Sequence, residues 1–232
     1  MWNWAKPRTL YEMPDSWTYK RRLYPQFARV GQTLASEKRL ELVDLLAQAP
    51  RNVDALATLT GMSVASTSQH LQVLLRARLV ESRRIGTKIE YQLADESVLA
   101  LWLALCATAT SRLPEVAAAD RDLASEPTRQ SMIRRDDVGL LTAHGEILMI
   151  DVRPAQEYEH GHLPGAVSIP LEELPKHFDA LPRDRRIVAY CRGAYCMSAD
   201  EAVAALREHG FDAVRLDGGW PEWRAEGRER EA

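Results

Sequence analysis

A cysteine follows a short apolar run in the C-terminal half of this 232-residue chain. The run at residues 187–190 has the pattern of a buried strand, and Cys191 comes directly after it. A loop of small and polar residues then leads to Ser198, which with Glu201 three residues later predicts the N-cap of a helix. A loop that closes over a helix N-terminus turns its N–H groups inward and binds anions. We therefore expect Cys191 to be a reachable thiolate, with its pKa lowered by these amides and by Arg192.

A second thiol, Cys196, ends the same loop. It either resolves a persulfide on Cys191 into a disulfide or polysulfide bridge or fills the entrance of the helix, and the sequence leaves both interpretations open. The third cysteine, Cys106, lies among apolar residues and is expected to serve packing. Three cysteines are few and odd in number, which argues against a secreted disulfide framework and for a reducing, cytoplasmic location.

The composition is that of a globular protein, with 46% hydrophobic and 27% charged residues. Its length suits two domains of about 100 residues, each with its own core. No N-terminal stretch combines basic residues with an apolar run, and the longest apolar run, residues 98–107, is too short to span a bilayer. We therefore expect neither a signal peptide nor a membrane partner.

The net charge of −3 is unevenly distributed. Residues 20–93 carry a net charge of +6, residues 94–232 carry −9, and residues 1–19 are neutral. A basic block within an acidic chain suggests a local surface that binds a polyanion, although such a surplus is as often plain solvated surface.

The basic block has the pattern of three helices followed by a hairpin. Helices are predicted at residues 37–47, from Asn52 or Asp54 to Gly61, and from Ser63 to about Leu79. Two helices joined by a short turn that contains glycine are typical of a helix-turn-helix. Residues 79–84 and 88–93 then flank a tight turn and predict a β-hairpin.

The polar face of the third helix and the basic tip of the hairpin carry the side chains that we expect to contact DNA. Small hydroxyl and amide groups near a helix N-terminus reach base edges and phosphates, whereas arginine and lysine lie along the phosphate backbone. His70 is equally well explained as a packed surface residue. The expected contacts are Ser66, Thr67, Gln69, His70, Arg76, Arg83, Arg84 and Lys88.

These elements resemble the ArsR class of winged-helix transcription regulators over about residues 20–120. The resemblance is carried by residues 34–42, residues 66–74 and the hairpin up to Leu93. It implies a homodimer that binds an inverted repeat of duplex DNA, with the subunit contact formed by a helix at residues 95–111 and the N-terminal segment. Residues 51–54 lack the thiols of metal-sensing members, and no histidine lies in the dimer helix, so we expect no metal.

The second half alternates strands and helices. Residues 147–150, 187–190 and 213–216 are predicted strands, and the helical stretches between them indicate an α/β unit with a mostly parallel sheet. Ligands of such sheets gather at the carboxyl ends of the strands, where Asp151 and Cys191 lie.

This half resembles the rhodanese family of sulfurtransferases. Residues 151–154, 157–158 and 161–166 match its N-terminal signature, residues 216–223 match its C-terminal one, and Cys191 opens its active loop. The resemblance implies that Cys191 takes up a sulfane sulfur as a persulfide from thiosulfate, polysulfide or a low-molecular-weight persulfide. No cofactor is implied.

Other residues of this half are assigned supporting roles. We expect Asp151 and Arg153 to form a salt bridge that ties the loop to the sheet, and His162 to stabilise a turn. Related phosphatases need an arginine where this chain has Met197, so phosphoryl transfer is disfavoured. Many rhodaneses end the loop with a cationic or hydroxyl residue, whereas this loop ends with Cys196.

The sequence thus predicts a protein that is α/β overall, with a mostly α winged helix-turn-helix domain before an α/β rhodanese domain. The expected division is an aromatic extension (1–19), a DNA-binding and dimerisation domain (20–124), a linker (125–128) and the rhodanese domain (129–232). The extension carries Trp2, Trp4, Tyr11, Trp17 and Tyr19 and is expected to dock on its own dimer or on a partner.

The leading hypothesis for function is a sulfur-responsive transcription regulator that loads its signal on Cys191. Two alternatives stay open. One is a sulfurtransferase enzyme that uses the winged helix for dimerisation or localisation, and the other is a rhodanese domain that recruits a partner while Cys191 is idle.

Overall fold

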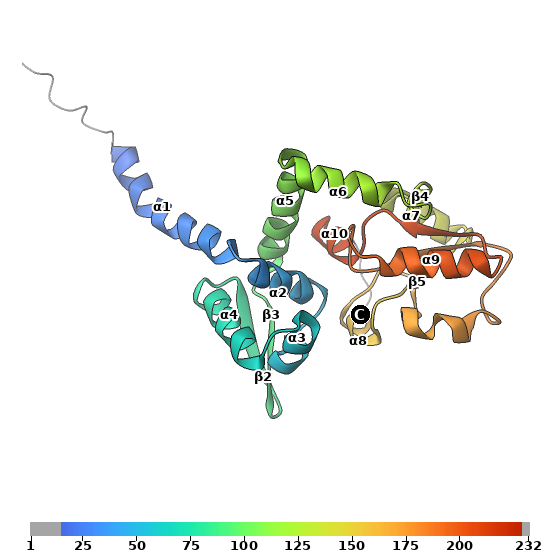
Figure 1. Cartoon of the computed structure of the whole chain (residues 1–232), viewed down its shortest axis with the longest axis horizontal. Coiled ribbons are helices and arrows are strands. Elements are labelled where there is room, and N and C mark those ends of the chain that lie inside the picture. Colours follow the sequence, from blue (N-terminus) through green and yellow to red (C-terminus); the bar gives the residue numbers. More distant parts are fainter. Residues whose placement is uncertain (1–14, 229–232) are drawn as a thin grey trace, which may run out of the picture.

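The computed structural model describes residues 15–228, with side chains from residue 19 onward. A helical N-terminal part and an α/β C-terminal part lie side by side, and two helices arch from one to the other (Figure 1). The N-terminal part comprises α1 (Asp15–Leu34), α2 (Glu37–Gln48), β1 (Arg51–Asn52), α3 (Val53–Thr60), α4 (Val64–Arg76), β2 (Val80–Ile85), β3 (Lys88–Leu93), α5 (Glu96–Arg112) and α6 (Pro114–Ala124).

Local signals in the sequence begin and end the helices of the N-terminal part. The Asn52 side chain accepts from the Ala55 amide at the start of α3, and Gly61 ends that helix in the left-handed conformation at φ 65°. The Ser63 side chain accepts from the Ser66 amide and begins α4. Two features differ from the prediction: α4 ends at Arg76, before Leu79, and the short β1 pairs with β3 to give a three-stranded sheet of order β1-β3-β2.

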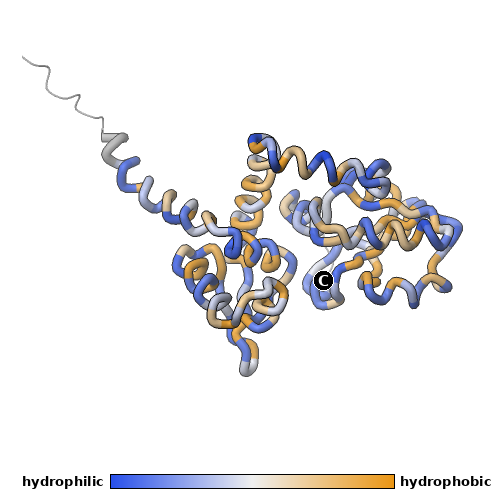
Figure 2. The backbone as a smooth tube through the Cα atoms, viewed as in Figure 1, coloured by the Kyte–Doolittle hydropathy of each residue, from blue (hydrophilic) through white to orange (hydrophobic). Residues whose placement is uncertain are grey.

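One apolar core joins α2, α3, α4, α5 and the hairpin. The inward residues recur at helical spacing, so each helix turns one stripe to the core. Fully buried members include Leu42, Val43, Leu56, Leu71, Leu74 and Leu99. In Figure 2 the hydrophobic colour concentrates in this core, in α5 and in the strands of the C-terminal part, whereas α1 is mostly hydrophilic and projects away from both.

The C-terminal part is a five-stranded sheet in which every neighbouring pair is parallel. Its order is β4-β8-β7-β5-β6, so β7 lies in the centre. The strands are β4 (Met132–Ile133), β5 (Ile147–Asp151), β6 (Val167–Ser168), β7 (Arg186–Tyr190) and β8 (Ala213–Leu216). The helices are α7 (Arg135–Ala143), α8 (Ala155–His160), the 3-10 helix η1 (Leu171–His177), α9 (Ser198–Glu208) and α10 (Trp220–Ala225). This is the α/β fold that the sequence predicts.

Both faces of the sheet are buried, which explains why β7 is apolar throughout. Ile187 and Ala189 pack into the cluster that contains α9 and η1, while Val188 and Tyr190 pack into the cluster that contains α7 and α10. Cys191 belongs to the α9 cluster. The alternation of strand side chains therefore continues one residue beyond the strand.

No single described helix is long and apolar enough to cross a bilayer. α5 and α6 meet that length and composition only when they are taken together, and they are bent by 95°.

The burial of Leu99 predicts that α5 depends on the winged-helix core. Leu99→Ala should lower the free energy of unfolding by about 2–5 kcal/mol, because it removes a fully buried side chain and leaves a cavity. Leu101→Ala is the matched control, since Leu101 lies on the same helix and is 38% exposed. Urea denaturation followed by circular dichroism measures both, and equal losses would contradict the packing.

Candidate functional site

The loop at residues 191–196 begins at the carboxyl end of the central strand β7 and ends at α9. Two glycines allow it to close tightly. Gly193 has φ 137°, a conformation that favours glycine, and a Cβ there would touch the Glu222 carboxylate. A Cβ at Gly219, the residue before α10, would strike the carbonyl of Cys191 and the backbone of Gly193. The C-terminal signature around Gly219 therefore provides the surface on which the loop rests.

Charged side chains hold the loop carbonyls. Asp200 at the start of α9 is buried and pairs with Arg215 of β8 and with Arg129. Arg129 donates to the Ala194 carbonyl at 2.7 Å and to the Cys196 carbonyl at 3.4 Å, and Arg215 donates to the Gly193 carbonyl at 3.4 Å. The amides of Ala194 and Cys196 donate to Glu222 and to the Gly193 carbonyl, so the amides directed at the Cys196 sulfur are those of Arg192 and Ser198.

The structure corrects the expectation that Cys191 is a reachable thiolate. Its side chain is fully buried in the α9 cluster because it continues the alternation of β7. Its sulfur lies 3.5 Å from the carbonyl oxygen of Cys196 and is also within hydrogen-bonding reach of the Cys196 side chain, so its one proton is shared between the two. Its contact with Cys196 and its burial raise the pKa of Cys191 well above the usual value, against a lowering contribution from the Ala199 amide. Cys191 is therefore a protonated thiol in this state.

The lowered pKa that was expected for Cys191 belongs to Cys196. Its pKa is lowered to about 5, first by hydrogen bonding from Cys191 and then by the Arg192 amide and by the hydroxyl and amide of Ser198. Because the Ser198 hydroxyl is directed at sulfur, it does not cap α9; the N-cap is Met197, one residue earlier than predicted, and Ser198 is the first helical residue. The anion nest of the loop thus holds the Cys196 sulfur.

A pocket of about 320 Å³ opens beside the two thiols. Arg153, Cys191, Arg192 and Cys196 line it, together with residues of the η1 region such as Leu171 and Glu172. Arg153 is 1% exposed, and its Nη1 has no hydrogen-bond partner among the described residues. Two arginines and two thiols in one pocket suit an anionic sulfur compound.

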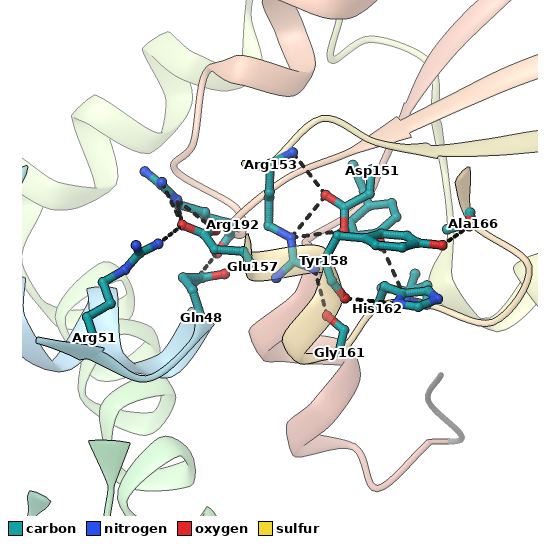
Figure 3. A network of polar contacts seen from close by, with 12 residues as sticks. Gln48, Arg51, Asp151, Arg153, Glu157, Tyr158, Gly161, His162, Ala166 and Arg192 are labelled. Atoms are coloured by element: carbon teal, nitrogen blue, oxygen red, sulfur yellow. Dashed lines mark hydrogen bonds and ion pairs between the residues drawn. The ribbon is translucent and has the colours of Figure 1, made fainter. Parts of the chain in front are cut away.

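Asp151 and Arg153 form the predicted salt bridge at the end of β5. Arg153 Nη2 lies 2.6 Å from Asp151 Oδ2 and also donates to the Gly161 carbonyl at 2.8 Å (Figure 3). His162 supports the neighbouring turn as predicted, since its Nδ1 lies 2.9 Å from the Tyr158 carbonyl and its ring stacks on Tyr158. The contacts with Asp151 and Gly161 fix the position of Arg153, which lines the pocket.

The loop also contacts the N-terminal part, through a group of four side chains that we call the junction: Gln48, Arg51, Glu157 and Arg192. Glu157 of α8 is completely buried and pairs with Arg51 of β1 and with Arg192 of the loop at 2.7 Å (Figure 3). Gln48, at the end of α2, donates to the carbonyl of Arg192 at 3.0 Å. The backbone of Arg192 is therefore bonded directly to the winged-helix part, and its side chain is linked to Arg51 of that part through Glu157.

The helix and hairpin expected to contact DNA present most of the predicted side chains to solvent. Gln69, Arg76, Arg83, Arg84 and Lys88 are exposed, and Ser66 and His70 are partly exposed. Thr67 is a wrong prediction, because it is fully buried and its hydroxyl donates to the Ser63 carbonyl at 3.0 Å. It packs on the core side of α4 and cannot contact DNA there.

Other features lie outside the predictions. No local signal in the sequence indicates the loop contacts of Gln48, Glu157, Asp200, Arg129 and Arg215, because their partners are distant in the chain. Within residues 15–228, no group of three or more His, Cys, Asp or Glu residues could hold a metal. The prediction for the aromatic extension falls largely on residues outside the described part of the chain.

Comparison with known proteins agrees with this geometry. The model of the family "Bacterial regulatory protein, arsR family" matches residues 36–82, and the model of the rhodanese-like domain matches residues 135–226. An HTH-type transcriptional regulator of Mycobacterium tuberculosis is 44% identical over 212 residues, which cover 90% of this chain and 91% of the relative. The chain belongs to the arsR family of bacterial regulatory proteins and carries a C-terminal rhodanese-like domain.

Further matches cover one part of this arsR-family protein each. A sulfurtransferase of Allochromatium vinosum is 31% identical over 83 residues, 35% of this chain and 76% of the relative. A solved structure of a homodimeric winged helix-turn-helix DNA-binding domain from Mycobacterium bovis is 40% identical and covers 46% of this chain and 95% of its own, with a TM-score of 0.41. The family makes the chain a DNA-binding transcription regulator fused to a rhodanese-like domain.

The pKa values of Cys196 and Cys106 are shifted in opposite directions, which predicts that their alkylation by iodoacetamide depends differently on pH. Cys196 should react with a midpoint near pH 5, because its thiolate exists above that pH and is lost as the pH falls through it. Cys106, whose pKa is raised to about 11 by burial, is an internal control that should react only in strongly alkaline solution. Ser198→Ala should move the midpoint of Cys196 upward. Peptide mass spectrometry across pH measures both rates, and coincident profiles would contradict the assignment.

Proposed function

We propose that this chain is a cytoplasmic regulator whose affinity for DNA responds to sulfane sulfur taken up by the loop at residues 191–196. The observation that carries the proposal is the hydrogen bond from Gln48 at the end of α2 to the carbonyl of Arg192 in that loop. Movement of the loop would thereby be transmitted to α2, which packs against α3 and α4. DNA binding and sulfur loading therefore share one structural element.

The charges beside the loop indicate how sulfur loading would change this contact. Arg192 lines the pocket beside the thiols while its guanidinium is held by Glu157 at 2.7 Å. A persulfide formed in the pocket can ionise, and its negative charge competes with Glu157 for Arg192. Glu157 is then paired with Arg51 but no longer with Arg192, so the link that Glu157 makes between the loop and the winged-helix part weakens. Sulfur loading should accordingly loosen the junction.

The proposed sulfur donor is an anion such as thiosulfate, polysulfide or a low-molecular-weight persulfide. Arg153 and Arg192 supply positive charge to the pocket, and Cys196 supplies a thiolate. The persulfide that follows would be shared between Cys196 and the buried Cys191, with Cys191 kept as the proposed carrier within the loop. Arg192, Cys191 and Cys196 are the residues proposed to carry the chemistry.

The proposed DNA complex is a homodimer on an inverted repeat. Large apolar side chains of α1 and α5 are exposed in the single chain: Tyr24, Phe27, Leu101 and Leu105. Exposed apolar side chains on neighbouring helices are typical of a surface that is covered in the assembly. In such a dimer the two copies of α4 and of the hairpin would lie on successive turns of the duplex.

The switch predicts a change in operator affinity on treatment with inorganic polysulfide. Affinity should change by roughly 5–150-fold for the full-length protein, because that is the usual range for coupling between two sites. Cys191→Ser and Gln48→Met should both lose most of the response. Gln48→Met removes the bond to Arg192 and also removes the Gln48 Oε1 atom, which is buried without a partner among residues 15–228, so the fold should be retained.

Fluorescence anisotropy with labelled operator DNA measures this response. Glu96→Gln is the matched control, since the Glu96–Arg224 ion pair also joins the two parts of the chain but does not involve the loop. Equal affinities before and after treatment would overturn the switch. Turnover of thiosulfate with no preference for any DNA site would favour the sulfurtransferase alternative.

The hairpin predicts how binding depends on salt. Arg83→Ala should weaken binding to all sequences alike and reduce the slope of log affinity against log salt by about 1, because an exposed arginine on the hairpin contacts phosphate rather than bases. Arg185→Ala, an exposed arginine of the C-terminal part, is the control and should leave the slope unchanged. An unchanged slope in Arg83→Ala would contradict the proposed orientation of the hairpin.

A further inference from the structure

One face of α5 lies against the active loop. Trp102, Cys106 and Thr110 recur every four residues and therefore share this face. Trp102 donates to Asp44 of α2 at 3.2 Å, and the Thr110 hydroxyl lies 2.7 Å from the Tyr195 hydroxyl in the loop. Cys106 lies between these two contacts, on the side of α5 that faces the residue next to Cys196.

A cavity of about 290 Å³ separates Cys106 from the loop. Its walls come from both parts of the chain: α2 and α5 on one side, and the loop with α10 on the other. Cys106 and Cys196 both line it. Cys196 also lines the pocket that Cys191 shares, so this residue borders both spaces.

The two thiols of the cavity differ in charge. Cys196 is ionised, whereas burial and the charges of Asp44 and Glu222 raise the pKa of Cys106 to about 11. A neutral thiol beside two carboxylates reacts slowly with an anionic donor from solution. Cys106 is therefore protected from direct attack, although it lies next to the sulfur that the loop would load.

We infer that Cys106 is the internal acceptor of sulfane sulfur, which the rhodanese-like loop passes through the cavity from Cys196 to the DNA-binding part of the same chain. The inference rests on the proposed function and names the thiol on which its signal is delivered. The usual interpretation of Cys106 as plain packing does not explain why it faces a second cysteine across a cavity between the two parts.

The transfer is balanced without an added oxidant. The Cys196 thiolate first attacks a terminal sulfur of inorganic polysulfide, and the polysulfide shortened by one sulfur leaves with the electron pair. The outer sulfur of the Cys196 persulfide takes up a proton from solvent, Cys106 loses its own proton to solvent, and the Cys106 sulfur attacks the neutral outer sulfur. The bond between Cys196 and that sulfur breaks, its electron pair returns to Cys196 as thiolate, and Cys106 carries the –S–SH group.

The product changes the contact between the two parts. A persulfide lengthens the Cys106 side chain by about 2 Å and adds a readily ionised group to a cavity that already contains Asp44 and Glu222. Like charges in such a partly buried space repel one another. Since α5 also contributes Leu99 to the winged-helix core, displacement of this face reaches the DNA-binding elements.

The test uses the full-length protein, a small excess of inorganic polysulfide and peptide mass spectrometry after alkylation. In the wild type, an added sulfur should appear at Cys106 after it appears on the loop. Cys106 labelling should be lost in Cys196→Ser, whose own Cys106 is intact and serves as the control for direct reaction. Equal labelling of Cys106 in that variant would overturn the transfer.

Cys106→Ser separates this inference from the proposed function. The variant should still load sulfur on the loop, since it keeps Cys191 and Cys196, but its operator affinity should respond less to polysulfide than that of the wild type. A full response in Cys106→Ser, or sulfur that stays on the loop of the wild type, would overturn the internal acceptor and leave the sulfur-responsive regulator standing. An absence of sulfur from the loop in every variant would overturn both.

Discussion

The burial of Glu157 between two arginines constrains the rest of the structure. Arg51 comes from the winged-helix part and Arg192 from the active loop, and the carboxylate between them is completely buried. A buried charge that loses a partner destabilises a protein strongly, by about 3–5 kcal/mol. The two parts of the chain and the loop must therefore keep their positions together. Any event that moves Arg192 away from Glu157 therefore affects both the loop and the winged-helix part.

A second buried carboxylate fixes the loop from the opposite side. Asp200 pairs with Arg129 and Arg215. These arginines in turn donate to three carbonyls of the loop, those of Gly193, Ala194 and Cys196. Arg129 lies in the segment that follows α6, so the part of the chain that leaves α5 and α6 also contacts the loop. The loop is thus bound by one charge group at the junction and by another at the start of the rhodanese-like domain. Such a loop has few intermediate positions, which favours a change between two discrete states over gradual drift.

The sequence predicts the elements well and the site only in part. Caps at Asn52 and Ser63 and the period of the apolar residues give the helices, because these signals act within a few residues. The state of Cys191 was predicted wrongly, since its position after β7 suggested a free loop while the alternation of the strand turns its side chain inward. The partners of Arg192 are 35 and 144 residues away, at Glu157 and Gln48, and no local pattern indicates such contacts.

Two thiols in one loop divide the tasks that a single reactive cysteine would combine. A sulfur that is to meet a donor from solution needs access to a pocket and negative charge. Cys196 is half-buried and lines the pocket, and hydrogen bonds from Cys191, from the Arg192 amide and from Ser198 lower its pKa to about 5. A sulfur that must keep a persulfide from reacting with solvent needs burial, and Cys191 has that because it belongs to the core of the sheet. The Cys191 thiol stabilises the Cys196 thiolate by hydrogen bonding, so modification of either sulfur changes the ionisation of the other. Since the backbone of the same loop is bonded to Gln48, the proposed switch would link the chemical state of this pair to the position of α2 in both directions.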